Sequence, residues 1–247
     1  MRRTSRWVVL AVLALAAVGG AAWHWRQQVL DLGWPAARKP PLAPATLAEW
    51  LRQLTPEATT RLRPAFDAAG VPFPPAAVRL VAFKDQRRLV LYARGASGPW
   101  RLVRRNAVLA ASGGAGPKLA EGDRQVPEGR YRVTFLNPNS QFHVSLRLDY
   151  PNAEDRAQAA RDGRSNLGGD IMIHGSNVSI GCLAMGDEVA EDLFVLAALT
   201  GIANVEAIIA PTDLRVAPPP PGTTAARPWV GALYDRVRQA LEELPPA

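Results

Sequence analysis

The spacing of the apolar residues changes near residue 78, and this change limits the chain to a fold that is mainly β. Up to Gly70 the apolar residues recur at helical spacing, with Leu62 and Phe66 on one face. Beyond residue 78, short apolar runs are separated by turn residues, as in a series of β-strands. We expect strands over residues 78–83, 88–92, 100–110, 131–136, 170–174 and 204–209.

The run from Phe142 to Asp149 alternates strictly between apolar and polar residues, which predicts a half-buried strand. Its apolar face would carry Phe142, Val144, Leu146 and Leu148. Its polar face would carry His143, Ser145, Arg147 and Asp149.

Helices are expected before and after these strands. Thr46 and Glu49 have capping-box spacing and open a helix that runs to about Leu54. Thr55 and Pro56 then read as the start of a second helix that ends at Gly70. Further helices are expected over residues 152–164, over 187–200 with Asp187 as the cap, and over 229–244.

The predicted fold class is a β-rich domain with flanking α-helices at both ends. At 247 residues with 48% hydrophobic side chains, the chain is long and apolar enough to bury a core. The expected parts are a membrane anchor or signal peptide over 1–25, a Pro-rich linker over 26–45, a helical pre-domain over 46–77, the β-rich domain over 78–215, and a Pro-rich segment with a C-terminal helix over 216–247.

The first residues have the pattern of an export signal. Arg2, Arg3 and Arg6 precede an uninterrupted apolar run over 7–23, which is near the minimum length for crossing a bilayer. Gly20-Ala21-Ala22 also fits a signal-peptide cleavage site. The segment is therefore either an uncleaved inner-membrane anchor, which we favour, or a removed leader. In both cases the domain lies outside the cytoplasm.

The net charge of +7 does not indicate a nucleic-acid partner. Residues 1–45 contain six basic residues and one acidic residue, so most of the basic excess belongs to the leader and linker. Without a basic excess on the domain itself, binding to nucleic acid loses its main support.

Cys182 is the single cysteine of the chain, so it cannot form an internal disulfide. It is either a buried, inert residue or a free thiol kept for chemistry. His174 precedes it by eight residues, and glycines stand beside both residues, which suits a thiol nucleophile with a nearby base. The backbone N–H groups of Gly181 and Cys182 are candidates for stabilising an oxyanion. One cysteine and one histidine fall short of a metal site, so we expect no metal.

The run Ile173-His174-Gly175 … Ser179-Ile180-Gly181-Cys182 resembles the signature of the L,D-transpeptidase catalytic domain, a family of cysteine acyltransferases of bacterial peptidoglycan. The upstream segment 116–131, with Gly116-Pro117-Lys118 and Val126-Pro127-Glu128-Gly129-Arg130-Tyr131, resembles the loop and strand that precede the catalytic half of that family. The resemblance covers about residues 78–211. Segments 136–140, 149–152 and 178–187 are more similar to a Gram-negative branch that includes an enzyme detaching the outer-membrane lipoprotein from murein.

The resemblance implies that Cys182 is the nucleophile, that His174 is the general base, and that the carbonyl of Gly175 orients the imidazole. Two positions depart from the family pattern. Ile180 stands where most members have histidine, and Ala184 stands where most have arginine. The second departure puts the usual acceptor specificity in doubt, but not the nucleophile.

Four further residues are candidates for contact with substrate: His143 and Arg147 on the polar strand face, Ser179 in the motif, and Lys118 in the upstream loop. Arg147 is favoured as the replacement for the missing arginine, because its permanent charge can pair with a carboxylate of the stem peptide. A solvated surface position is the alternative for Arg147, His143 and Lys118.

The function expected from the resemblance is that of a periplasmic L,D-transpeptidase-type enzyme. It would form a thioester with a stem peptide at meso-diaminopimelate and transfer it to an amine, without a cofactor. One alternative is an amidase that releases lipoprotein from peptidoglycan through the same thioester. Another is a catalytically silent module that binds the cell wall. The expected partners are peptidoglycan stem peptides, murein-linked lipoprotein and the inner membrane.

Overall fold

The computed structural model describes residues 46–223 and 227–247. The anchor or signal peptide expected over 1–25 and the linker expected over 26–45 therefore lie outside the described residues. Within the described ranges, no helix is both long enough and apolar enough to cross a membrane.

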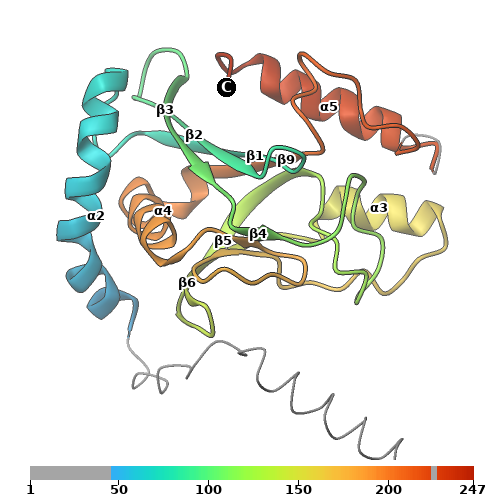
Figure 1. The fold of residues 1–247 in the computed structure, drawn as a ribbon, viewed down its shortest axis with the longest axis horizontal. Helices are drawn as coiled ribbons and strands as arrows, with labels where there is room; N and C mark the ends of the chain where they lie inside the picture. Colours follow the sequence, from blue (N-terminus) through green and yellow to red (C-terminus); the bar gives the residue numbers. More distant parts are fainter. Residues whose placement is uncertain (1–45, 224–226) are drawn as a thin grey trace, which may run out of the picture. The chain divides into compact units, whose positions relative to one another are not determined.

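A nine-stranded mixed sheet forms the centre of the described part, and Figure 1 shows most of its strands with labels. The strand order is β3-β2-β1-β9-β5-β6-β7-β8-β4. The neighbours β1 and β9 are parallel, as are β7 and β8, and the other pairs are antiparallel. The strands are β1 (Ala77–Phe83), β2 (Arg88–Arg94), β3 (Arg101–Ala107), β4 (Ala110–Ala111), β5 (Gly129–Ser140), β6 (His143–Leu148), β7 (Met172–His174), β8 (Leu183–Ala184) and β9 (Val205–Ala210).

The single strand expected over 100–110 is two strands in the structure. β3 lies at one end of the strand order and β4 lies at the other end. The chain therefore leaves the first edge after Ala107 and reaches the opposite edge by Ala110, next to β8. A continuous apolar pattern cannot reveal such a change of pairing partner, because the pairing depends on strands distant in sequence.

Helix α2 (Leu47–Ala69) corrects the expectation of two helices. The Thr46–Glu49 capping box opens it, and Gly70 ends it in the left-handed conformation, both as expected. Pro56 and Pro64 nevertheless lie inside one continuous helix. The buried side chains repeat every four residues across Pro56, so tertiary packing offsets the hydrogen bond that the proline removes. They are Trp50, Leu54, Ala58, Leu62 and Phe66.

The other helices fall close to their expected ranges: α3 (Ala153–Arg161), α4 (Asp187–Thr200), the short 3₁₀ helix η1 (Ile202–Asn204) and α5 (Val230–Glu242). The expected capping role of Asp187 is wrong. Gly186 is the N-cap residue and no side chain caps the helix. The Asp187 carboxylate instead accepts the backbone N–H of Ser176 at 2.7 Å, outside the helix.

Two hydrophobic cores lie on opposite faces of the sheet. Alternation along β9 shows this: Ala207 and Ile209 belong to one core, whereas Ile208 and Ala210 belong to the other. The first core contains the buried faces of α2 and α4, which lie side by side in Figure 1. The second contains α5 and residues of β1, β2 and β9, but none of β6, β7 or β8 among the described residues. The expected fold class, β-rich with helices at both ends, is confirmed.

Candidate active site

The register of β6, β7 and β8 brings the two principal candidates to one face of the sheet. His174 is paired with Ser145 on β6 and with Ala184 on β8. Cys182 directly precedes β8, one residue before Leu183, which is buried in the first core. Because side chains alternate along a strand, Cys182 and His174 face away from that core. Among the described residues, the second core, which contains α5, includes no residue of these three strands.

His174 is held as a neutral base. Its side chain is buried, and its Nδ1 lies 2.6 Å from the carbonyl oxygen of Gly175. A carbonyl oxygen can only accept a hydrogen bond, so Nδ1 carries the proton and Nε2 keeps a lone pair. Burial lowers the pKa of His174, and the Gly175 carbonyl opposes that shift only in part. The contact to Gly175 that the resemblance implied is therefore present.

Cys182 is a free, half-buried thiol. Its Sγ donates to the backbone carbonyl of Asp170 at 3.6 Å. Burial is the main cause that raises the pKa of Cys182, and the negative charge of Asp170 adds to it. The backbone of Met172 and the charge of Lys118 act in the opposite direction. With the pKa of His174 lowered as well, the resting pair is a thiol and a neutral imidazole.

Gly175 occupies a position where no other residue fits. A Cβ there would lie 2.5 Å from Asp187 Oδ1, 2.8 Å from the Phe142 carbonyl oxygen and 2.9 Å from His143 Cβ. The backbone of the residue that orients the imidazole is thus in close contact with the start of β6 and the start of α4. The glycine after His174 is required by this close packing.

The loop between His174 and Cys182 is held together by Ser179. Its hydroxyl donates to the Cys182 carbonyl oxygen at 2.7 Å. It also accepts the N–H groups of Gly181 at 3.3 Å and of Cys182 at 3.1 Å. Gly181 has φ +124°, a conformation that favours glycine.

Two predicted roles concern these same groups, and both stay predictions. The N–H groups of Gly181 and Cys182, expected to receive an oxyanion, both donate to Ser179 in this structure. The Ser179 hydroxyl, expected to contact substrate, is used within the loop. An oxyanion can reach these N–H groups only by displacing the hydroxyl from them.

His143 does not lie on the predicted polar face. Its backbone has φ +73°, which interrupts the alternation of the strand at its first residue. The ring contacts Trp50 of α2 edge-on, with centroids 5.3 Å apart, and Nε2 donates to Glu191 of α4 at 2.8 Å. Phe142, expected on the apolar face, instead stacks on His174, with ring centroids 4.8 Å apart. The alternation was wrong for both residues, because a single left-handed residue reverses the faces.

Arg147 lies at the edge of the site. It is paired with Met172 in the sheet, on the same face as His174. Its guanidinium forms an ion pair with Asp170 at 2.9 Å, and both side chains are largely exposed, at 48% and 73%. Asp170 therefore contacts the guanidinium through its carboxylate and the thiol through its carbonyl.

Lys118 is buried and paired, so the solvated alternative is wrong for it, while its contact with substrate stays a prediction. Its ammonium donates to Asp123 at 2.5 Å and to the carbonyl oxygen of Ala120 at 2.8 Å. The Asp123 carboxylate also accepts the N–H groups of Leu119, Ala120 and Gln125. Lys118 thus closes the upstream loop, and its charge reaches Cys182 only at longer range.

Three residues at the site were missed from sequence: Phe142, Asp170 and Asp187. Asp170 was placed in a strand, but it precedes β7 and has φ +52°. Aspartate tolerates this conformation better than most residues, so the Gly168-Gly169-Asp170 run offered a turn signal. Nothing local marked Phe142 or Asp187, whose partners come from other elements.

The two departures from the family pattern differ in their surroundings. Ile180, two residues before Cys182, is 78% exposed, and Val178 in the same loop is also exposed. Ala184 is fully buried between β7 and β4, so an arginine would not fit there in this structure. No group of three or more His, Cys, Asp or Glu residues in the described part of the chain is arranged to hold a metal ion.

Comparison with known proteins places this site in context. A family model described as the L,D-transpeptidase catalytic domain (YkuD) matches residues 77–223. The Escherichia coli (strain K12) protein named "Putative L,D-transpeptidase YafK" is 36% identical over 119 residues, which are 47% of this chain and 46% of that protein. The chain thus spans about half the length of the curated relatives that it matches.

Solved structures with similarity to the chain include two named proteins. The helical cell shape determining protein Pgp2 of Campylobacter jejuni is 23% identical, with a TM-score of 0.45, over 55% of this chain and 48% of that one. The Mycobacterium tuberculosis L,D-transpeptidase 1 is 14% identical, with a TM-score of 0.32, over 54% of this chain and 62% of that one.

Proposed function

Since this chain belongs to the L,D-transpeptidase catalytic domain family, we propose that it is a peptidoglycan-modifying cysteine acyltransferase of the periplasm. The observation that carries the proposal is the His174 tautomer. Its Nδ1–H is bound by the Gly175 carbonyl, which leaves Nε2 as a base on the sheet face that Cys182 shares.

The first half-reaction forms a thioester. Nε2 of His174 removes the proton of the Cys182 thiol as sulfur attacks the amide carbonyl that follows the L-centre of meso-diaminopimelate. The tetrahedral intermediate collapses, the C–N bond breaks, and the leaving amine takes the proton from the imidazolium. In the second half-reaction an acceptor amine attacks the thioester and gives its proton to His174. The sulfur then leaves and is protonated again.

The acceptor distinguishes a transferase from an amidase. If water attacks the thioester, the same enzyme is a hydrolase. In this alternative it cleaves the bond that links lipoprotein to murein. Ile180 and Val178 are exposed apolar side chains beside the nucleophile, and an acceptor that covers them gains hydrophobic contact that water does not provide. We therefore place the transferase first and the amidase second.

Arg147 is the residue proposed to bind a carboxylate of the stem peptide. It pairs with Asp170 in this structure, so a substrate carboxylate must replace Asp170 as its partner. Arg147→Ala is expected to raise the substrate concentration at half-maximal rate more than it lowers the maximal rate, because ground-state binding is lost. Wild-type kinetics in this variant would contradict the role.

Delivery of the domain to the periplasm is proposed from the N-terminal sequence. The pattern of residues 1–25 favours attachment to the inner membrane. The alternative is that this segment is a signal peptide that is removed. N-terminal sequencing of the mature protein from membrane and soluble periplasmic fractions distinguishes the two.

The central experiment tests the nucleophile. Purified protein is incubated with sacculi that carry linked lipoprotein, and the released or newly joined muropeptides are identified by mass. A β-lactam of the carbapenem class should add one equivalent of mass at Cys182, and Cys182→Ser should lose both the adduct and the activity. Full activity of Cys182→Ala on sacculi would exclude the mechanism. A wild-type protein that changes no muropeptide and forms no adduct would favour the silent wall-binding module.

A further inference from the structure

The turn that joins β5 to β6 carries two aromatic rings that point to different neighbours. The ring of Phe142 stacks on His174, with an interplanar angle of 29° and centroids 4.8 Å apart. The ring of His143 points to the helices and contacts Trp50 of α2 and Glu191 of α4. The left-handed backbone of His143, with φ +73°, produces this split.

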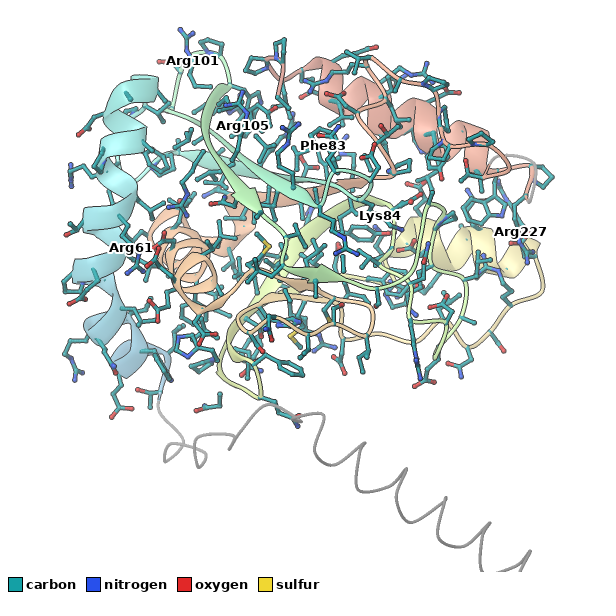
Figure 2. The ribbon with its side chains drawn as sticks, in the orientation of Figure 1. Arg61, Phe83, Lys84, Arg101, Arg105 and Arg227 are labelled. Carbon is teal, nitrogen blue, oxygen red and sulfur yellow. The ribbon has the colours of Figure 1, made fainter. Side chains whose placement is uncertain are left out.

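The His143 side of the turn is fixed by a charged network between helices. Glu191 accepts from His143 and pairs with Arg61 of α2 at 3.1 Å. Arg61 also binds the fully buried carboxylate of Asp192 at 2.7 Å, and Arg104 of β3 binds the other oxygen of that carboxylate at 2.7 Å. Figure 2 shows Arg61 between α2 and α4.

The same turn also packs against the group that orients His174. A Cβ at Gly175 would lie 2.8 Å from the Phe142 carbonyl oxygen and 2.9 Å from His143 Cβ. The Gly175 N–H donates to the Val144 carbonyl, directly after the turn. A shift of the turn therefore disturbs both the stacked face of the imidazole and the carbonyl that holds its Nδ1–H.

We propose that helix α2 helps to position the general base His174 through the Phe142–His143 turn. In this arrangement Phe142 is a positioning residue that fixes the imidazole plane, and Trp50, Arg61 and Glu191 hold the turn in place. The inference rests on the role of His174 in the proposed function. The family model begins at residue 77, so α2 lies outside the part of the chain that it matches. The helix would then be an active-site support that this chain adds to the catalytic domain.

The first test follows the imidazole of His174 by NMR in the full chain without substrate. In the wild type, the stacked Phe142 ring should shift the His174 ring protons upfield. Phe142→Leu should remove that shift, whereas Phe142→Tyr, which keeps an aromatic ring, should retain it. Because burial is the main cause of the lowered pKa of His174, uncovering the ring should also raise that pKa toward 6.5.

The second test changes a residue of α2 and follows the effect on the His174 ring. The Trp50 ring nitrogen is buried without a hydrogen-bond partner among the described residues, so Trp50→Phe keeps an aromatic contact and loses no bond. Trp50→Ala should move the His174 ring signals, and Trp50→Phe should not. Leu62→Ala, a buried change on the same helix, is the matched control, since it weakens packing away from the turn.

The acylation rate gives the functional readout. Trp50→Ala and Phe142→Leu should each slow acylation of Cys182 by about 10-fold or more, as expected when a positioned base loses its orientation. Leu62→Ala should leave the rate per folded molecule unchanged. If the His174 signals in Trp50→Ala match the wild type, the proposal is overturned. Because those signals are read without substrate, that result is separate from a failure of the acyltransferase function, which would appear as a wild-type protein that forms no acyl-enzyme.

Discussion

At the scale of single residues, the site depends on two groups that are both kept uncharged at rest. Burial lowers the pKa of His174 and raises the pKa of Cys182, so neither shift favours a resting thiolate–imidazolium pair. In the proposed mechanism the proton therefore moves during attack, with His174 as the general base. The role of the Gly175 carbonyl is to keep Nε2 free for that step.

The pH dependence of acylation follows from these directions. Acylation requires neutral His174, whose pKa lies below 6.5, so the rate should rise with pH along a limb centred below 6.5. His174→Gln should lower the rate by about 10²–10⁴-fold and remove the limb. Single-turnover acylation by a carbapenem-class β-lactam between pH 4.5 and 8 measures both. A limb that persists in His174→Gln would assign it to another group.

Asp170 gives a second prediction at this scale. Its negative charge raises the pKa of the Cys182 thiol, so Asp170→Asn should lower that pKa. The side chain is largely exposed, so the effect should be small and should shrink as salt is added. Alkylation rates by iodoacetamide between pH 7 and 10 report the thiolate fraction. Asp67→Asn, an exposed change on α2, is the control, and an equal shift in both variants would show a general charge effect.

At the scale of elements, buried polar groups join helices to the sheet. Helix α3 is an example, because Asp155 caps it by accepting the Asn152 N–H at 2.9 Å and also receives the Tyr131 hydroxyl at 3.3 Å. Burial raises the pKa of Asp155 from 3.8 to about 6. A carboxylate with a raised pKa is a source of pH-dependent stability in this element.

The raised pKa of Asp155 makes the stability of the fold fall as the pH rises. Between pH 3.8 and about 6 the folded chain holds a proton on Asp155 that the unfolded chain has released. The free energy of unfolding should therefore fall as pH rises through this window, and the loss should be complete above about 6. Urea unfolding at several pH values checks this for wild type and Asp155→Asn. The difference between the two proteins isolates Asp155, and a difference that does not vary with pH would refute the assignment.

At the scale of the whole molecule, a buried ion pair joins segments that are far apart in the sequence. Lys84, which follows β1, lies 3.0 Å from Glu128, and both side chains are nearly inaccessible to solvent. The other oxygen of Glu128 accepts the Tyr234 hydroxyl of α5 at 2.7 Å. Lys84 also donates to the Gly116 and Val126 carbonyl oxygens. The pair thus joins β1, the upstream loop and the C-terminal helix.

Breaking this pair on one side should destabilise the entire domain. Lys84→Met leaves the Glu128 carboxylate buried without its cation, which should reduce the free energy of unfolding by about 3–5 kcal/mol. Adding Glu128→Gln should recover part of the loss, because the amide is neutral and can still accept the Tyr234 hydroxyl. Chemical unfolding followed by circular dichroism measures both. If Lys84→Met costs no more than a surface substitution, the pair does not stabilise the domain.

Much of this protein could be read from local sequence. The hairpin of β1 and β2, the end of α2 at Gly70 and the range 187–200 of α4 follow from periodicity, turn residues and caps, which act over a few residues. The Cys182–His174 candidates followed from residue type and glycine spacing, and the Gly175 contact from the family resemblance. The N-terminal export pattern belongs to the same group, since it is a property of consecutive residues.

The tertiary structure decided what depends on residues distant in sequence. Pro56 stays inside α2 because the apolar stripe packs on the core on both sides of it. His143 and Phe142 exchanged faces because one left-handed residue reverses the alternation, and Trp50 and Glu191 stabilise the result. Lys118 and Ser179 were expected to face substrate, and the fold gives both side chains hydrogen-bond partners that their local sequence does not reveal. The sequence by itself determined which groups can do the chemistry, because reactivity belongs to the residue type. Only packing determined which of those groups remain free to do it, because each hydrogen bond within the fold occupies a donor or acceptor that substrate could otherwise use.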